Sequence, residues 1–373
     1  MRIAFYAPIK PPDHPIASGD RLIARNLIAA MRHADHNVDL ASAFIAYSKR
    51  PEDDILQQRK AEALQEARAV FSRLSPAPPD CWVTYHPYCK APDWIGPFVC
   101  KALSIPYVTV EAARTGQGFE NGGDLWRNWR AEAQSGIRSA TLHLCFKPTD
   151  RDYLRSLGIS DQQTAMIPPF IDTQSNRASS KACLPEHWRD DWPILMTAGM
   201  MRPGKKVENY RRIAEALKGL QALHWTFVAV GDGPEAETIK GFFETIDPTR
   251  LHFAGAVDHA DVINLMRQSD VFVWPGWKEP IGMVYLEAQL CGLPVCALES
   301  MGVPLVVRHG QTGLLSPQDH AEAFRENLAQ LVSHPSLRSD LSRNAKAHVE
   351  SYHSLIAVSA IIDRALREKL TTL

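Results

Sequence analysis

Two successive series of strands and helices, separated by one polar stretch, constrain this chain more than any other feature. Short apolar runs with strand character alternate with segments whose apolar residues recur at helical spacing, over residues 1–172 and again over 193–349. Residues 173–192 are mostly small or polar and hold no such period. Alternation of this kind is typical of parallel sheets covered by helices. We therefore expect an α/β chain with two Rossmann-like domains joined by a linker.

The expected strands are short runs bounded by Pro, Gly or helical segments. They lie at residues 2–7, 37–44, 81–85, 106–111 and 141–146 in the first series, and at 194–198, 225–230, 251–254, 271–274 and 294–297 in the second. The first expected helix carries Leu22, Leu27 and Met31 at helical spacing. Further helices are expected at 51–74, 207–219, 235–245, 259–268 and 283–291, followed by a helical stretch over 320–370. We expect the last part of the chain, about 350–373, to pack back on the N-terminal domain.

Composition excludes several classes of function. Lys and Arg number 41 against 42 Asp and Glu, so the formal net charge of -1 excludes a generally basic nucleic-acid-binding protein. The seven cysteines form no CxxC pair, which argues against a disulfide framework or a zinc ribbon. No run approaches the roughly 18 apolar residues of a membrane span. We expect a cytoplasmic protein without an integral membrane segment, with peripheral contact at the inner membrane face left open.

The segment EPIGMVYLE, residues 279–287, carries the strongest chemical signal. In open α/β sheets, ligands bind at the carboxyl ends of the strands, and this segment follows one. Gly282 lets the backbone approach a ligand, and the N–H groups of Met283 and Val284 at a helix start suit a phosphate. Glu287 can accept from the paired hydroxyls of a ribose, and Glu279 lies where an attached sugar would be. The alternative is a helix-dipole contact for Glu287 and a surface position for Glu279.

Two further strand ends carry anion-binding patterns. The segment GMMRPGKK, residues 199–206, begins at Gly199 and contains Arg202, Lys205 and Lys206. Three cations after a strand suit the negative charge of a diphosphate. The alternative is a solvent-exposed basic turn. VGDGP, with Gly231, contains GxG but not the dinucleotide fingerprint GxGxxG.

The first series offers two weaker candidates. The loop with Ser18, Gly19 and Asp20 opens the first expected helix and is a candidate anion site. His86 follows a strand in TYHPY, although a single His at such a place is more often structural.

The motifs together resemble the retaining GT-B glycosyltransferases of family 4, the glycosyl transferases group 1. The resemblance rests on GMMRPGKK after a strand, VGDGP, the E-x(7)-E of EPIGMVYLEAQLCGLPVCA, and GVPLVVRHGQTGLL. It is strong over about 190–320 and looser over 1–175. It implies a GT-B fold with an N-terminal acceptor domain and a C-terminal donor domain. It also implies transfer of a sugar from a nucleotide-diphosphate sugar to an acceptor hydroxyl, without a metal or another cofactor.

The resemblance also implies roles for single residues. Arg202 and Lys206 match the basic pair that holds the donor diphosphate, a role that Lys205 could share. Glu287 matches the carboxylate on the ribose, and Glu279 the one near the donor sugar. Residues that match the backbone or loops around the diphosphate and sugar are Gly282, Met283 and Gly19.

This chain departs from the family on the acceptor side. Glu111 stands where many members have a His, which leaves His86 and Glu111 as the candidate acceptor-side groups. Aromatic candidates for stacking on a sugar or covering a lipid are Trp126, Trp129, Phe119 and Tyr88, although such residues more often serve packing. Two alternatives stay open: a nucleotide-sugar epimerase on the same fold, and an inactive nucleotide-sugar-binding subunit.

Overall fold

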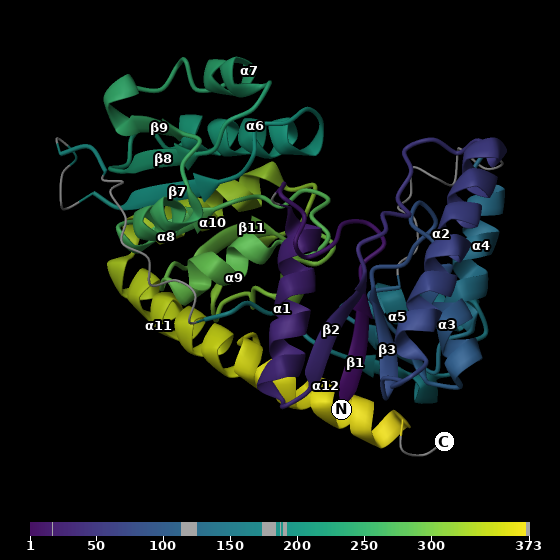
Figure 1. Ribbon diagram of the computed structural model, residues 1–373. Coiled ribbons are helices and arrows are strands. Elements are labelled where there is room, and N and C mark those ends of the chain that lie inside the picture. Colours follow the sequence, from purple (N-terminus) through teal and green to yellow (C-terminus); the bar gives the residue numbers. More distant parts are fainter. Residues whose placement is uncertain (17, 113–124, 174–183, 187, 189–191, 371–373) are drawn as a thin grey trace. The chain divides into compact units, whose positions relative to one another are not determined.

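The computed structural model describes residues 1–16, 18–112, 125–173, 184–186, 188 and 192–370. The chain divides by its internal contacts into two compact units (Figure 1). The first comprises Met1–Pro168 with Leu355–Leu373, and the second comprises Pro169–Ser354. Most of the expected linker, residues 174–183, 187 and 189–191, lies outside the described residues, as does Phe119.

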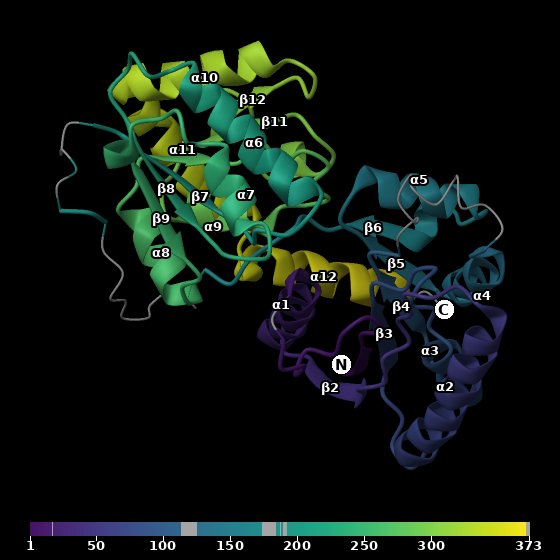
Figure 2. The same cartoon turned by 90° about the horizontal axis from the view of Figure 1, so that it is seen from above.

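The first unit is built on a six-stranded parallel sheet. Its order is β2-β1-β3-β4-β5-β6, with β1 Arg2–Tyr6, β2 Asn37–Ser42, β3 Cys81–Tyr85, β4 Tyr107–Val110, β5 Leu142–Cys145 and β6 Thr164–Met166. Strands β3, β4 and β5 are buried along their whole length, as expected of a parallel sheet covered on both faces. The helices are α1 Gly19–His33, α2 Asp53–Leu74, α3 Ile95–Leu103, α4 Arg127–Arg138, α5 Pro148–Ser156 and α12 Leu355–Leu370. Helix α12 packs against α1 (Figure 2).

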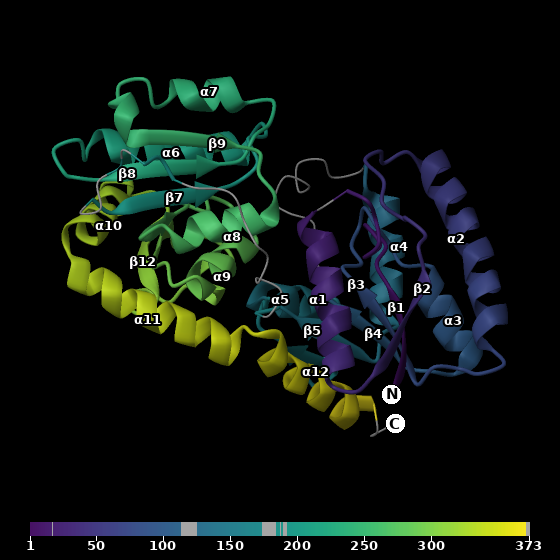
Figure 3. The ribbon, with the colours of Figure 1, turned by 60° about the vertical axis from the view of Figure 1, so that its left-hand side comes forward.

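The second unit repeats this plan. Its parallel sheet has the order β12-β11-β10-β7-β8-β9, with β7 Ile194–Ala198, β8 Thr226–Val230, β9 Leu251–Gly255, β10 Val271–Val273, β11 Val295–Leu298 and β12 Gly313–Ser316. The helices are α6 Lys205–Lys218, α7 Ala236–Gly241, α8 His259–Arg267, α9 Met283–Leu290, α10 Ala321–Ser333 and α11 Pro335–Tyr352. Helix α6 lies beside α10, and α9 lies beside α8 and α11 (Figure 3). The two doubly wound sheets confirm the predicted α/β class.

Some elements differ from the sequence-based expectation. Strands β6 and β12 were not expected, because TAM and GLLS hold at most one β-branched or aromatic residue, unlike the equally short β10, VFV. The expected helical stretch over 320–370 is three helices, interrupted at His334 and again at His353 and Ser354. The expected helix over 235–245 is shorter, Ala236–Gly241. Among the described residues no helix is long and apolar enough to span a membrane.

Candidate functional site

The basic turn after β7 is packed backbone against backbone on the turn after β8. Met201 N donates to the Asp232 carbonyl at 2.9 Å, and Gly199 N donates to the Val230 carbonyl at 2.9 Å. Gly231 has φ +137°, and a Cβ there would lie 2.0 Å from the Gly199 carbonyl oxygen. Only glycine fits this close approach. The GxG of VGDGP therefore has a structural role here, which is to support the turn that carries the cations.

The three cations of that turn have different surroundings. Lys206, in the first turn of α6, donates from Nζ to Glu279 Oε2 at 3.2 Å and lies 4.8 Å from the centre of the buried Trp274 ring. Lys205 Nζ reaches the Lys278 carbonyl at 3.3 Å. Arg202 is exposed. Lys206 is thus held between a carboxylate and an aromatic face, whereas Arg202 extends into solvent, where it is accessible to an anion.

Glu279 comes from the loop that follows β10 and leads into α9. That helix begins at Met283, as the sequence predicted, and no side chain caps its first N–H groups. Gly282, the residue before it, has φ +75°, and a Cβ there would lie 2.5 Å from the Tyr285 ring. The geometry thus requires glycine at the point where the N–H groups of Met283 and Val284 become available to a ligand.

Glu287 has a partner that the sequence did not indicate. Its Oε1 lies 3.0 Å from Nε2 of His259, the first residue of α8. The Glu287 side chain is 14% exposed and that of His259 is 61% exposed. The hydrogen bond that His259 donates to Glu287 raises the pKa of His259 above its usual value, although partial burial opposes the shift. His259 follows β9 by four residues, so inspection of the residues after that strand could have found it.

In the first unit, a pair forms between His86 and the start of α1. His86 Nδ1 lies 3.1 Å from Asp20 Oδ1. Burial opposes a charged imidazole, but the negative charges of Glu111 and Asp20 together raise the pKa of His86. At the same helix start, a Cβ on Gly19 would meet no atom within 4 Å, so packing does not require glycine there.

Glu111 is the centre of a second cluster of polar side chains in the first unit, and this cluster is nearly buried. Glu111 Oε1 accepts from Lys147 Nζ at 2.5 Å, and its Oε2 accepts from the Tyr85 hydroxyl at 3.3 Å. The side chains of Glu111 and Lys147 are 6% and 15% exposed. Burial raises the pKa of the neighbouring Asp150, which also contacts Lys147, to about 6. Lys147 follows β5 by two residues and was missed, because no motif draws attention to a single Lys.

Backbone strain is concentrated at these strand ends. Among the described non-glycine residues with positive φ, four lie in loops that follow a strand: His86, Glu111, Lys278 and Met301. His86 and Glu111 have φ values of +59° and +52° directly after β3 and β4. Residues held in the left-handed region cost of order 1–3 kcal/mol each and cluster at functional sites. This strain supports a site at both sets of strand ends.

A cavity of about 460 Å³ in the first unit lies away from these strand ends, next to Asp93, Glu132 and Lys101. The carboxylate of Asp93 accepts from the N–H groups of Ile95 and Gly96, the Thr84 hydroxyl and the Tyr107 hydroxyl. Glu132 accepts from Lys60 and Trp94. Both carboxylates are engaged within the protein, so we assign no ligand to this cavity. No group of three or more His, Cys, Asp or Glu suited to a metal ion is found in the part of the chain that the structure describes.

Comparisons with known proteins agree with this arrangement. Residues 186–348 match the model of the family Glycosyl transferases group 1. A D-rhamnosyltransferase, WbpZ, of Pseudomonas aeruginosa is 30% identical over 167 residues, 43% of this chain and 42% of the relative. A D-inositol 3-phosphate glycosyltransferase of Saccharomonospora viridis is 36% identical over 212 residues, 53% of this chain and 48% of the relative. The chain thus spans about half the length of these relatives or less.

Solved structures extend the likeness over the whole chain. A sucrose-phosphate synthase from Thermosynechococcus elongatus superposes with a TM-score of 0.74 at 17% identity and covers 100% of both chains. Anabaena HepE, solved in complex with UDP and glucose, superposes with a TM-score of 0.63 at 17% identity, over 98% of this chain and 99% of that one. These matches confirm the predicted GT-B fold.

Proposed function

We propose that this chain is a retaining glycosyltransferase that moves a sugar from a nucleotide-diphosphate sugar to an acceptor hydroxyl. The observation that carries the proposal is the meeting of two strand-end segments in the second unit. There, Lys206 of the basic turn contacts Glu279 of the loop leading to the open N-terminus of α9. Cations and free N–H groups at one sheet edge are what a diphosphate requires, and an adjacent carboxylate suits the sugar it carries.

On the donor side, Lys206 and Arg202 offset the negative charge that develops on the departing diphosphate. The N–H groups of Met283 and Val284 contribute through the positive end of the helix dipole. Glu287 accepts from the ribose hydroxyls, with His259 orienting its carboxylate. Glu279 lies near the sugar, where positive charge grows as the bond to the diphosphate breaks. The nucleoside diphosphate bound in Anabaena HepE supports a donor of this class.

On the acceptor side, we propose that the strand ends of the first unit receive the hydroxyl-bearing substrate. His86, paired with Asp20, offers an imidazole that is partly buried, with a side chain 21% exposed. Glu111, fixed by Lys147 and Tyr85, contributes a rigid charged wall rather than a free base, because both of its oxygens are engaged. The acceptor class remains a glycan, a lipid-linked sugar or a small molecule.

The cations of the basic turn supply the charge compensation that a divalent metal supplies in other transferases. We therefore propose that the reaction proceeds without a metal. Activity should survive a chelator such as EDTA. Complete loss in EDTA, restored by Mg²⁺ or Mn²⁺, would contradict this part of the proposal.

A panel of nucleotide sugars tests the proposed function. A donor at 100 times its dissociation constant should stabilise the chain by about 2.7 kcal/mol, which a thermal shift detects. With an acceptor added, NMR of the product should show the anomeric configuration of the donor. Turnover without any acceptor or hydrolysis would instead favour the epimerase. Tight donor binding with no turnover on any acceptor would favour the inactive subunit.

A further inference from the structure

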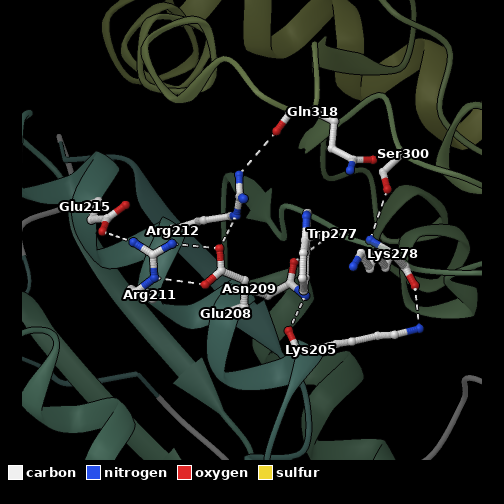
Figure 4. A network of polar contacts seen from close by, with 10 residues as sticks. All are labelled: Lys205, Glu208, Asn209, Arg211, Arg212, Glu215, Trp277, Lys278, Ser300 and Gln318. Carbon is white, nitrogen blue, oxygen red and sulfur yellow. Dashed lines mark hydrogen bonds and ion pairs between the residues drawn. The ribbon is translucent and has the colours of Figure 1, made fainter. Parts of the chain in front are cut away.

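A buried amide joins the two segments of the candidate donor site. Asn209 lies one turn into α6 and is 0% exposed. Its Nδ2 donates to the Lys205 carbonyl at 2.7 Å, and its Oδ1 accepts from the Trp277 backbone N–H at 2.8 Å (Figure 4). One side chain therefore ties the first turn of α6, which carries the cations, to the loop after β10, which carries Glu279.

The same loop is braced from its other side by the loop that follows β11. Lys278 N donates to the Ser300 hydroxyl at 3.1 Å (Figure 4). Gly302 N donates to the Glu279 carbonyl at 3.2 Å, and a Cβ on Gly302 would lie 1.8 Å from the Pro280 carbonyl oxygen. The Glu279 loop thus has two supports. The β11 loop supports it from one side. Helix α6 supports it from the other, through Asn209 and through Lys205 Nζ, which reaches the Lys278 carbonyl at 3.3 Å. Of these two side chains Lys205 is exposed and Asn209 is buried.

We propose that Asn209 is a positioning residue for the donor site, which rests on the function proposed above. Asn209 touches neither donor nor acceptor. It fixes the distance between the first turn of α6 and the Glu279 loop, so that Lys206 faces the diphosphate while Glu279 faces the sugar. Both hydrogen bonds are to backbone atoms, so the tie positions the two segments and leaves the functional side chains free to exchange partners when the donor enters.

The substitution Asn209→Leu tests this, because leucine has a similar volume and makes neither hydrogen bond. We expect kcat to fall about 10- to 100-fold, since a displacement near 1 Å at a reacting centre costs up to that much. Donor KM should change by less. The matched control is Ile213→Val. Ile213 lies one turn further along the same helix and is equally buried, and its side chain makes no hydrogen bond to the Glu279 loop. It should keep wild-type kcat at a temperature well below its Tm.

Hydrogen exchange of the Trp277 amide supplies a readout that does not depend on activity. The amide should be protected in the wild-type chain and in Ile213→Val, and exchange faster in Asn209→Leu. Faster exchange with wild-type kcat and KM would overturn the inference and leave the proposed function intact. A wild-type chain that binds no nucleotide sugar would overturn the function, and the inference with it, whatever the exchange shows.

A second variant keeps the test valid if Asn209→Leu does not fold. Asn209→Asp retains an acceptor for the Trp277 N–H and loses the donor to the Lys205 carbonyl. In this variant the Trp277 amide should stay protected from exchange. Its kcat should fall by a smaller factor than that of Asn209→Leu, which removes both hydrogen bonds. An unchanged kcat in Asn209→Asp, or an equal loss in Ile213→Val, would show that Asn209 only stabilises the fold.

Discussion

Lys206 and Glu279, 73 residues apart in the chain, form an ion pair with 3.2 Å between Nζ and Oε2. Their side chains are 30% and 21% exposed, so solvent and an incoming anion can reach the pair. A diphosphate that binds beside Lys206 would compete with Glu279 for the ammonium group. The Glu279 carboxylate would then be free to interact with the sugar. The pair therefore links the two functions that the sequence assigned to separate motifs.

Loss of the exposed cation should reduce catalysis without affecting the fold. Arg202→Ala should lower kcat/KM by about a hundredfold, because a guanidinium that stabilises a developing negative charge is removed. Arg211→Ala is a matched control, since Arg211 on α6 pairs only with Glu208 and Glu215 in the described structure. Steady-state kinetics with the donor varied measures both. Near-normal turnover in folded Arg202→Ala would show that Arg202 takes no part in binding the diphosphate.

The two carboxylates should respond differently to amide substitution. Ribose contacts exist in both ground and transition states, so Glu287→Gln should mainly raise donor KM. Positive charge grows at the sugar only in the transition state, so Glu279→Gln should lower kcat more than it raises KM. Kinetics on both variants with the donor varied separates these effects.

Two outcomes of that experiment would change the roles assigned to Glu279 and Glu287. If both variants keep wild-type kcat and KM, the carboxylates play no part in donor binding or transfer. If the pattern is reversed, the sugar and the nucleotide lie the other way along α9. Glu279→Gln also removes the ion pair of Lys206, whereas His259→Gln disturbs only the partner of Glu287. The fall in kcat should therefore be larger for Glu279→Gln than for His259→Gln.

The sequence predicted what depends on local pattern. Gly282 followed by an apolar helix placed the start of α9 at Met283, and the alternation of strands with helices predicted the two parallel sheets. It could not predict pairs that form between distant segments. Nothing in the local sequence shows that Glu287 meets His259, or that Lys147 pairs with Glu111. Lys147 meets Glu111 because β5 lies beside β4, and Glu287 meets His259 because α8 packs beside α9. Both arrangements are properties of the whole fold.

The close packing of the two turns predicts a sensitivity at Gly231. Because a Cβ there would overlap the Gly199 carbonyl and the backbone has φ +137°, Gly231→Ala should destabilise the second unit by about 2 kcal/mol or more. Gly241→Ala is the control, since a Cβ at Gly241 would meet only Glu244 Oε1 at 3.5 Å. Urea unfolding followed by tryptophan fluorescence compares the two. Equal stability would show that the turns do not need this contact.

The pair of His86 and Asp20 predicts a pH dependence of stability. Burial opposes ionisation of both groups. The negative charges of Glu111 and Asp20 nevertheless raise the pKa of His86 above 6.5, and the hydrogen bond with His86 lowers the pKa of Asp20 below 3.8. The His86 contribution is therefore fully present below pH 6.5 and lost as pH rises through the raised pKa. The Asp20 contribution is present above pH 3.8 and lost as pH falls through the lowered pKa.

Asp20→Asn measures this contribution. The difference in unfolding free energy between wild type and Asp20→Asn should be largest between pH 3.8 and 6.5, and should shrink as the pH rises further. Urea titrations across the range give the two curves. A difference that is flat or grows above neutrality would mean that His86 is not charged in the folded chain.

In the proposed donor site Lys206 holds the diphosphate of a nucleotide sugar, and the substitution Lys206→Met tests this role. Methionine keeps an unbranched stem against Trp274 and removes only the charge. Turnover of the donor found in the panel is measured for wild type, Lys206→Met and the exposed neighbour Lys205→Met. We predict a loss of about a hundredfold or more in kcat/KM for Lys206→Met at unchanged Tm, and a much smaller loss for Lys205→Met. Wild-type turnover by folded Lys206→Met would show that Lys206 does not hold the diphosphate.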